Sequence, residues 1–381
     1  MLNGNICQIC KQYPLNFDST SSYFWRDART KTRERKAPSN GVLIEVSQMK
    51  SIQRTLMCSL ILASVFCSML AKSATSNDIS SLPEGHSILA EGVLLGDMTR
   101  LTSGKPPSDN FDLLDWSLTL PTDLNKDLKA DTIYENPLSS GFELKPLFYT
   151  ADDGGMVFAS PNMGAKTSKN TKYARTELRE MLRRGNSREK TQGITGNNWV
   201  FAGAHGSVKR KAGAVEGSLE ATLAVNRVST TGDEKMVGRV IIGQIHATND
   251  EPIRLYYRKL PQNEHGSIYF AHEINDGNDT WINLIGSRSH TQADPADGIK
   301  LNEKFSYKIT VENDSLFVTL IREGKANMSK VLDMSHSGYD KSNQYMYFKA
   351  GVYNQNNGGD PKDYVQATFY HLDNQHKGYR H

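Results

Sequence analysis

Three short stretches of this sequence, 175–180, 240–246 and 347–355, carry more polar chemistry than β-strands usually do. Side chains alternate between the two faces of a strand, so residues two apart share a face. In each stretch one face is polar and the residues between are mainly apolar. The polar residues are Arg175, Glu177, Arg179, Gln244, His246, Tyr347, Lys349, Tyr353 and Gln355. If the three strands pair side by side, these groups form the floor of a groove.

Such a set of side chains is suited to stabilising an anion and to moving a proton. Arg175 can present a planar pair of donors to a carboxylate, and the Gln244 amide can add another. His246, with an ordinary pKa of about 6.5, can be a neutral base, whereas Tyr353, with an ordinary pKa of about 10, can donate a proton. On one strand alone, a solvated outer face explains the polar residues equally well. The three together, with Tyr, His and Gln around concentrated Arg, favour a functional groove.

The elements that must position these groups are predicted to be strands. Short alternating runs recur across 110–381, as in 218–228, and the runs 305–311 and 316–321 form a predicted hairpin. Helical periodicity is scarce, and its best candidate is a turn or two near Asp123–Asp127. This pattern predicts an all-β fold, a β-jelly-roll sandwich of two antiparallel sheets with a concave substrate groove.

Charge and cysteine content divide the chain in two. Residues 1–74 hold 10 Lys/Arg and 4 Asp/Glu, which gives +6, whereas the remaining 307 residues hold 35 and 38, which gives −3. The main body is therefore not a globally basic nucleic-acid binder. All four cysteines (Cys7, Cys10, Cys58 and Cys67) lie in the first part, which excludes a disulfide-stapled fold or a Cys-ligated zinc site in the main body.

The first part of the chain reads as an export leader. A positive stretch at 50–54 runs into the mostly apolar, uncharged 55–71, and small residues follow, so 49–74 is predicted to be a secretory signal peptide. Residues 1–48 are then an upstream extension, and Met49 is the true start. Residues 75–109 are rich in Ser, Gly and Pro, and we expect them to form a linker or a loosely ordered segment. We expect a secreted, monomeric protein, extracellular or periplasmic, without stable membrane association.

Along the chain the three polar stretches read Arg-Thr-Glu-Leu-Arg, Gln-Ile-His and Tyr-Phe-Lys-Ala-Gly-Val-Tyr-Asn-Gln. They resemble, in the same order, the signature strands of the alginate lyases of polysaccharide lyase family 7. Residues 111–121, Phe-Asp-Leu-Leu-Asp-Trp-Ser-Leu-Thr-Leu-Pro, are similar to the start of that domain. The resemblance covers about 110–381. It implies a β-jelly-roll enzyme that cleaves alginate by β-elimination, with no metal or other cofactor.

The implied reaction explains why these residue types are needed. In a 4-linked uronan the C5 proton is α to a carboxylate, and its removal puts a second negative charge on an anionic group, so fixed donors dominate the barrier. The resemblance assigns these tasks to Arg175, Gln244, His246 and Tyr353, in agreement with their chemistry. The nearby cations are expected to lower the pKa of Tyr353, which could then also serve as a base. The predicted substrate-binding residues are Glu177, Arg179, Arg254, Tyr347, Lys349 and Gln355. Ile245 between Gln and His is associated in the family with guluronate-containing blocks.

The sequence also bears on other functions that a β-sandwich could carry. A retaining glycosidase on the same fold needs two carboxyls about 5–5.5 Å apart, and the nearest Glu-x-Asp-x-x-Glu match, 312–317, ends in Phe. A non-catalytic polyuronate-binding module, or a lyase acting on another polyuronate, stays open as an alternative. His265 and His272, and the acidic pair Asp294 and Asp297, form no zinc or EF-hand pattern.

Overall fold

The computed structural model describes residues 92–377 and residue 379 of the 381-residue chain. The predicted upstream extension 1–48, the predicted signal peptide 49–74, all four cysteines and about half of the predicted linker, 75–91, lie outside the described residues. No helix within the described part of the chain is long and apolar enough to cross a membrane.

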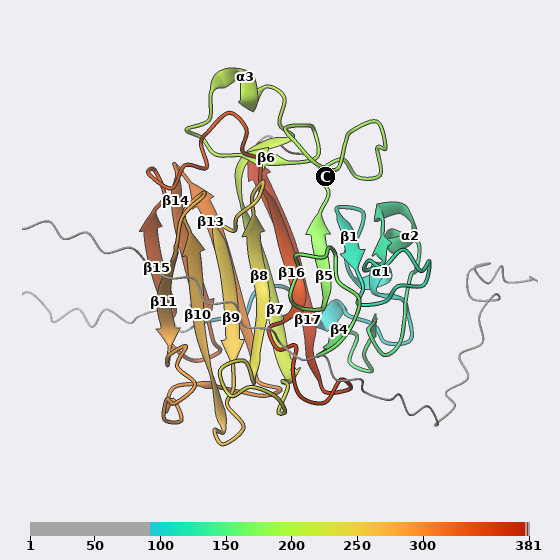
Figure 1. Ribbon diagram of the computed structural model, residues 1–381. Coiled ribbons are helices and arrows are strands. Elements are labelled where there is room, and N and C mark those ends of the chain that lie inside the picture. Colours follow the sequence, from blue (N-terminus) through green and yellow to red (C-terminus); the bar gives the residue numbers. More distant parts are fainter. Residues whose placement is uncertain (1–91, 378, 380–381) are drawn as a thin grey trace, which may run out of the picture. The chain divides into compact units, whose positions relative to one another are not determined.

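Two antiparallel sheets make up the fold, one in front of the other in Figure 1. The front sheet has nine strands. In spatial order they are β11 (Asp279–Ile285), β10 (His265–Glu273), β9 (Ile253–Arg258), β8 (Arg239–His246), β16 (Tyr347–Asn354), β5 (Arg175–Glu180), β1 (Trp116–Thr119) and β2 (Thr132–Ile133), with β12 (Ile299–Lys300) beside β10.

The back sheet has eight strands. In spatial order they are β15 (Met328–Asp333), β14 (Ser315–Ile321), β13 (Lys304–Glu312), β7 (Ala214–Arg227), β17 (Tyr364–Lys377), β4 (Met156–Pro161) and β3 (Phe148–Thr150), with the short β6 (Trp199–Val200) parallel to β7. The predicted hairpin is confirmed, since β13 and β14 pair with Ile309 opposite Val318.

Helices are few and short within the described residues. They are η2 (Met98–Arg100), α1 (Pro107–Asn110), α2 (Glu135–Ser139) and α3 (Gly206–Lys209). The prediction of a helical turn near Asp123–Asp127 was wrong, because no helix forms there. There the Asp123 carboxylate accepts hydrogen bonds from the backbone N–H groups of Asp127 and Leu128, at 2.9 and 3.1 Å. A side chain that binds the backbone in this way competes with helical hydrogen bonds.

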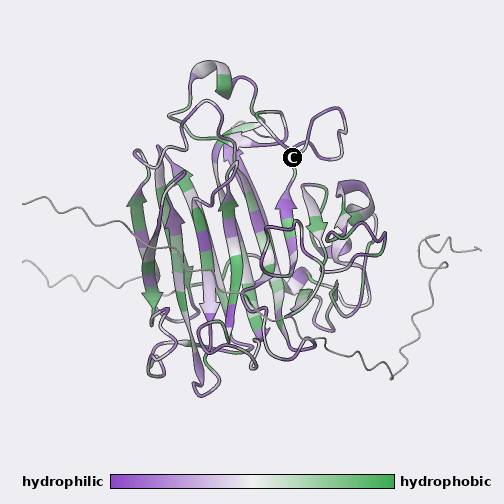
Figure 2. Cartoon of the chain, viewed as in Figure 1, coloured by the Kyte–Doolittle hydropathy of each residue, from purple (hydrophilic) through white to green (hydrophobic). Residues whose placement is uncertain are grey.

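The core lies between the two sheets and follows the predicted alternation. Leu219, Ala221 and Leu223 of β7 are fully buried, and they belong to one apolar cluster with Leu178 of β5 and Phe348 of β16. Polar and apolar bands alternate along the front strands (Figure 2). The β-jelly-roll prediction is therefore confirmed, and the outer face of the front sheet is left to carry polar groups.

The described end of the predicted linker packs on the sandwich. Leu95 donates its backbone N–H to Ser306 Oγ at 2.9 Å, and its carbonyl accepts from Thr222 Oγ1 at 2.7 Å. The Gly92 N–H donates to the Lys325 carbonyl at 2.8 Å. The packed chain thus begins before the boundary that we drew at residue 110.

Candidate active site

The three polar stretches are neighbours in the front sheet, because β16 lies between β8 and β5. Tyr353 is paired with Arg175, and Tyr347 is paired with His246. Lys349 lies between its two partners, Arg179 and Gln244. Residues from three separate parts of the sequence therefore share one face of the sheet, as the alternation and the expected side-by-side pairing required.

A groove of about 810 Å³ runs over this face. Eight of the ten predicted site residues line it: Arg175, Arg179, His246, Arg254, Tyr347, Lys349, Tyr353 and Gln355. The remaining two, Glu177 and Gln244, lie beneath its floor and are 1% exposed. The wall also contains residues that the sequence pattern did not indicate, namely Ser117, Thr119, Tyr134, Tyr173, Arg239, Glu251, Tyr256 and Trp281.

Glu177 is a buried counter-ion, which differs from the subsite role expected of it. Its Oε2 accepts from Arg175 Nη1 at 2.9 Å and from Lys349 Nζ, and its Oε1 accepts from Gln244 Nε2. Burial alone would raise the pKa of Glu177, but Lys349 and Arg175 outweigh it and hold that pKa below the usual range. From beneath the groove, one carboxylate thus holds two cations and an amide in place. Because two positive charges meet one negative charge, the groove keeps an excess of positive charge that can bind an anion.

The two cations respond differently to this environment. Burial and the neighbouring Arg175 lower the pKa of Lys349 to about 8, although Glu177 opposes the shift. Arg175 keeps its charge because Glu177 and Tyr353 outweigh the effect of burial and raise its pKa. Lys349 therefore loses its proton at a pH just above neutrality, whereas Arg175 does not.

His246 is held as a neutral imidazole with one nitrogen free to accept a proton. Its Nδ1 lies 2.6 Å from the carbonyl oxygen of Ala247, which can only accept, so Nδ1 carries the hydrogen. Burial and then the charge of Lys349 lower the pKa of His246 to about 3. The ring is stacked on Tyr347, with centroids 5.1 Å apart and an interplanar angle of 10°. Nε2 therefore carries a lone pair at neutral pH.

Tyr353 is held as a protonated phenol. Burial raises its pKa, and the opposing effect of Arg175 is smaller. We expected the neighbouring cations to lower this pKa, and that expectation was wrong because burial, helped by the charge of Glu177, outweighs them. The Arg175 guanidinium lies over the ring, and Tyr173 packs edge-on against it with centroids 6.2 Å apart.

Gly351, between the polar residues of β16, does not leave room for a ligand. A Cβ atom there would lie 2.7 Å from the backbone oxygen of Thr176 and 2.9 Å from Cα of Glu177. Its φ of +132° is one that residues with side chains rarely adopt. The glycine therefore allows β16 and β5 to approach closely where the pairing of β16 with β8 shifts register.

Arg179 lines the groove, but both of its terminal nitrogens donate to protein groups. It donates to the backbone oxygens of Glu180 and Thr191 and to Asn198 Oδ1, the last two at 2.7 Å. Its guanidinium also lies 3.9 Å from the centroid of the Tyr347 ring. These contacts indicate that Arg179 holds Tyr347 and the loop 181–198 in place.

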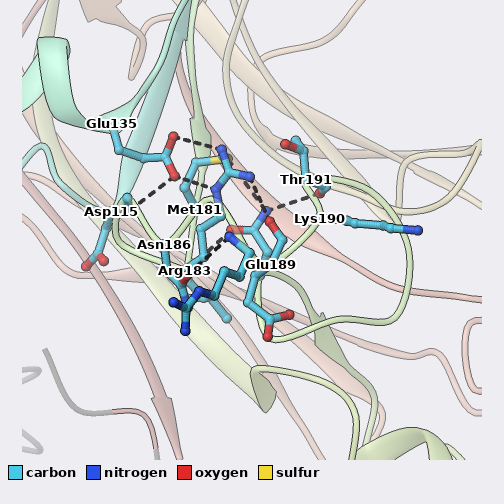
Figure 3. A network of polar contacts seen from close by, with 12 residues as sticks. Asp115, Glu135, Met181, Arg183, Asn186, Glu189, Lys190 and Thr191 are labelled. Carbon is cyan, nitrogen blue, oxygen red and sulfur yellow. Dashed lines mark hydrogen bonds and ion pairs between the residues drawn. The ribbon is translucent and has the colours of Figure 1, made fainter.

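That loop is further fixed by the polar network in Figure 3. Arg183 Nε donates to Glu135 Oε1 at 2.6 Å, and Arg183 Nη1 donates to the Glu189 carbonyl at 2.8 Å. The Met181 N–H donates to the Asp115 carbonyl at 2.6 Å. Thr191, in the same loop, lines the groove, so this network gives one end of the groove a rigid wall.

The opposite end of the groove combines charge with aromatic rings. Arg254 of β9, predicted to bind substrate, is surrounded by the carboxylates of Glu251, Glu273 and Asp279. Trp281 of β11 is tilted against Tyr256, with centroids 5.5 Å apart. Within residues 92–377 and 379 no group of three or more His, Cys, Asp or Glu is arranged to hold a metal ion.

Fold and site together define a β-jelly-roll protein with a cationic groove, and comparison with known proteins identifies its family. Residues 111–376 match the alginate lyase family (Alginate_lyase2). The chain is 53% identical over 283 residues to an alginate lyase of Klebsiella pneumoniae, which covers 72% of this chain and 92% of that protein. The chain therefore belongs to the alginate lyase family.

Solved structures agree with this assignment. A crystal structure of the alginate lyase from Klebsiella pneumoniae has a TM-score of 0.71 and 54% identity, and covers 72% of this chain and all of that one. An alginate lyase from Pseudomonas aeruginosa has a TM-score of 0.52 and 26% identity, and covers 70% of this chain and all of that one. Alginate lyase A1-II′, a member of polysaccharide lyase family 7, has a TM-score of 0.50 and 25% identity, covering 71% and 98%. The resemblance to that family is confirmed.

Proposed function

We propose that this protein cleaves the 4-linked uronate chain of alginate by β-elimination and leaves an unsaturated uronate at the new non-reducing end. One observation carries the proposal. A neutral imidazole with a free Nε2 (His246) and a protonated phenol (Tyr353) face the same groove floor as the cations Arg175 and Lys349. A base, an acid and an anion site in one groove are what the reaction needs.

The uronate carboxylate is bound first. Arg175 and Lys349 point their positive charge into the groove and are braced from below by Glu177. Gln244 lies beneath the floor and gives one amide N–H to Glu177, so we assign it to holding the carboxylate that braces both cations. As C5 loses its proton, the carboxylate gains enolate character, and donors that are already fixed stabilise it without reorganising.

Proton transfer then follows from the two protonation states. His246 Nε2 takes the C5 proton, the electron pair forms the C4=C5 bond, and the C4–O bond breaks as Tyr353 protonates the leaving oxygen. The low pKa of the free imidazole, about 3, reflects burial and then the charge of Lys349. A bound uronate carboxylate offsets that positive charge, and so raises the basicity of His246 when the substrate is present.

The test is an ultraviolet assay of the full chain with guluronate-rich, mannuronate-rich and mixed alginates in the presence of a chelator. The conjugated C=C–COO⁻ product absorbs, whereas a hydrolysis product does not. A rise in absorbance that disappears in His246→Ala supports the proposal. No rise on any alginate contradicts it, and a rise that the chelator abolishes contradicts the metal-independent mechanism.

Substrate preference is the finer part of the proposal. Ile245 stands between Gln244 and His246, as in family members associated with guluronate-containing blocks. We therefore propose faster cleavage of guluronate-rich than of mannuronate-rich alginate. Polygalacturonate tests the alternative of another polyuronate. Binding of alginate without any unsaturated product would instead support a binding module.

Export is the last part of the proposal. It rests on the positive, apolar and small-residue pattern of 49–74. The mature protein is then secreted and acts as a monomer. N-terminal sequencing of the protein recovered outside the cell tests cleavage near residue 74, and size-exclusion chromatography with light scattering tests the monomer.

A further inference from the structure

Glu251, in the turn between β8 and β9, lies next to the nitrogen that accepts the substrate proton. Its Oε1 is 3.4 Å from His246 Nε2. His246 Nδ1 is hydrogen-bonded to the carbonyl oxygen of Ala247, whereas Nε2 makes no hydrogen bond within residues 92–377. The carboxylate is thus close to Nε2 without occupying its lone pair in a hydrogen bond. When Nε2 is unprotonated, two electron-rich atoms face each other, and a proton on Nε2 converts the contact into an ion pair.

Glu251 is connected to further carboxylates. Its Oε2 lies 3.9 Å from Arg254 Nε, and Arg254 Nη2 lies 3.5 Å from Glu273 Oε2 and contacts Asp279. Burial and a hydrogen bond with Glu251 raise the pKa of Glu273 to about 7. One guanidinium thus contacts three carboxylates, and Glu273 holds a proton up to near neutral pH beside Glu251.

We propose that Glu251 is a positioning residue that stabilises the His246 imidazolium and, together with Glu273, passes the abstracted proton to solvent. This inference rests on the proposed β-elimination. The C5–H proton moves to Nε2 and then to Glu251, and the Tyr353 phenolate recovers its proton from water, so the enzyme returns to its starting state. The side chains of Glu251 and Glu273 are 22% and 23% exposed, which gives the proton a route out of the groove.

Other charged and titratable groups surround this path and must be kept constant in any test. Those facing His246 are Arg175, Glu177, Tyr347 and Lys349. Those facing the carboxyl pair are Arg254, His272, Asp279, Tyr339 and Tyr353. Among them Asp279 provides a matched control. It contacts the same Arg254 guanidinium, carries the same charge as Glu251, and is absent from the groove lining.

The first experiment measures kcat/KM against pH by the ultraviolet assay. In the wild type, kcat/KM should rise about tenfold as Glu273 loses its proton near pH 7, since one pKa unit of imidazolium stabilisation corresponds to a tenfold change. Glu251→Gln should lower the maximum about tenfold and remove this rise, and Glu273→Gln should remove the rise. Asp279→Asn should keep the maximum and the rise, with the rise moved to lower pH because the charge of Asp279 helps to raise the pKa of Glu273. Equal profiles for Glu251→Gln and the wild type would overturn the proposal.

A second measurement does not depend on turnover. The imidazole of His246 is titrated by ¹⁵N NMR in Tyr353→Phe with a bound alginate oligomer, whose carboxylate raises the pKa of His246 above its value in the free protein. That pKa should fall by about one unit when Glu251→Gln is added and stay nearly the same when Asp279→Asn is added. An unchanged pKa in Glu251→Gln overturns the inference even if the protein is an active lyase. A protein that makes no unsaturated product contradicts the proposed function, while the titration still decides the pairing of Glu251 with His246.

Discussion

The guanidinium of Arg175 lies 3.5 Å from the centroid of the Tyr353 ring, and the two residues are directly paired on β5 and β16. This contact joins the cation assigned to the substrate carboxylate to the phenol assigned to the leaving oxygen. A cation over an aromatic face is attracted by the ring and restricts its rotation. The anion site and the acid are therefore held at a fixed separation by strand register.

Removing the Tyr353 hydroxyl should separate acid catalysis from binding. Tyr353→Phe keeps the ring under Arg175, so the fold and the affinity for alginate should change little, while kcat should fall about 10²- to 10⁴-fold because the leaving oxygen is no longer protonated. The measurement is kcat and KM by ultraviolet absorbance, with thermal unfolding as the control for fold. A variant that keeps more than half of the wild-type kcat would remove Tyr353 from the mechanism.

Removing the buried charge of Glu177 should destabilise the protein. Glu177→Gln leaves Arg175 and Lys349 without their counter-ion in a buried site, which costs about 3–5 kcal/mol of unfolding free energy. The measurement is denaturant unfolding at neutral pH. Because the folded-state pKa of Glu177 is lowered, its stabilisation is present above the unfolded-state pKa and is lost as pH falls through the folded-state value.

A double variant checks the cause of this loss. In Glu177→Gln/Lys349→Met one of the two uncompensated cations is gone, so part of the lost stability should return. If the losses of the two single variants simply add, Glu177 does not act as a counter-ion for Lys349.

Activity should fall on the alkaline side as Lys349 loses its charge. The free-enzyme pKa of Lys349 is lowered to about 8 by burial and Arg175, so the ammonium is present below that pH and is lost above it. Since kcat/KM reports groups of the free enzyme, it should fall as pH rises through about 8. Lys349→Arg should move this fall to higher pH, because an Arg side chain stays protonated. An alkaline limb at the same pH in Lys349→Arg would assign the fall to another group.

Much of the groove floor followed from the sequence because a strand has a period of two. The alternation in 175–180 and 347–355 correctly separated the polar face from Leu178 and Phe348, which are in the core. Period alone, however, does not tell whether a polar side chain lines a groove or lies beneath it. Glu177 shares its face with two arginines, and the close approach of Lys349 from the next strand turned it into a buried counter-ion.

The rest of the site depends on pairings between distant strands, which the sequence pattern does not encode. Glu251 lies in a short turn with no periodic signal, and it reaches His246 only because β8 and β9 form a hairpin. Arg254 was correctly placed at the groove, but its three carboxylate partners come from the turn, β10 and β11. Trp281 stands in a run, Asp-Thr-Trp-Ile-Asn-Leu-Ile, without a distinct polar face.

Trp281 marks the far end of the groove and should affect how long chains bind. Gln244 is paired with Arg254, Arg254 with Ala271, and Ala271 with Trp281, so this row crosses four neighbouring strands. At about 4.8 Å per strand, Trp281 is about 14 Å from Gln244. Its ring lines the groove, and the guanidinium of Arg288 lies 4.5 Å from it. An aromatic face beside a cation suits a sugar ring that carries a carboxylate.

Trp281→Ala should therefore raise KM for polymeric alginate about fivefold, which corresponds to about 1 kcal/mol of lost stacking. The value of kcat should be unchanged, because the ring is remote from His246, and the products should shift in size. Trp281→Phe, which keeps a stacking face, should recover most of the affinity. The measurements are KM and product sizes on polymeric alginate and on short oligomers that do not reach this end. An equal rise in KM for both substrates would mean that the substitution disturbs the groove floor, and an unchanged KM for the polymer would remove Trp281 from substrate binding.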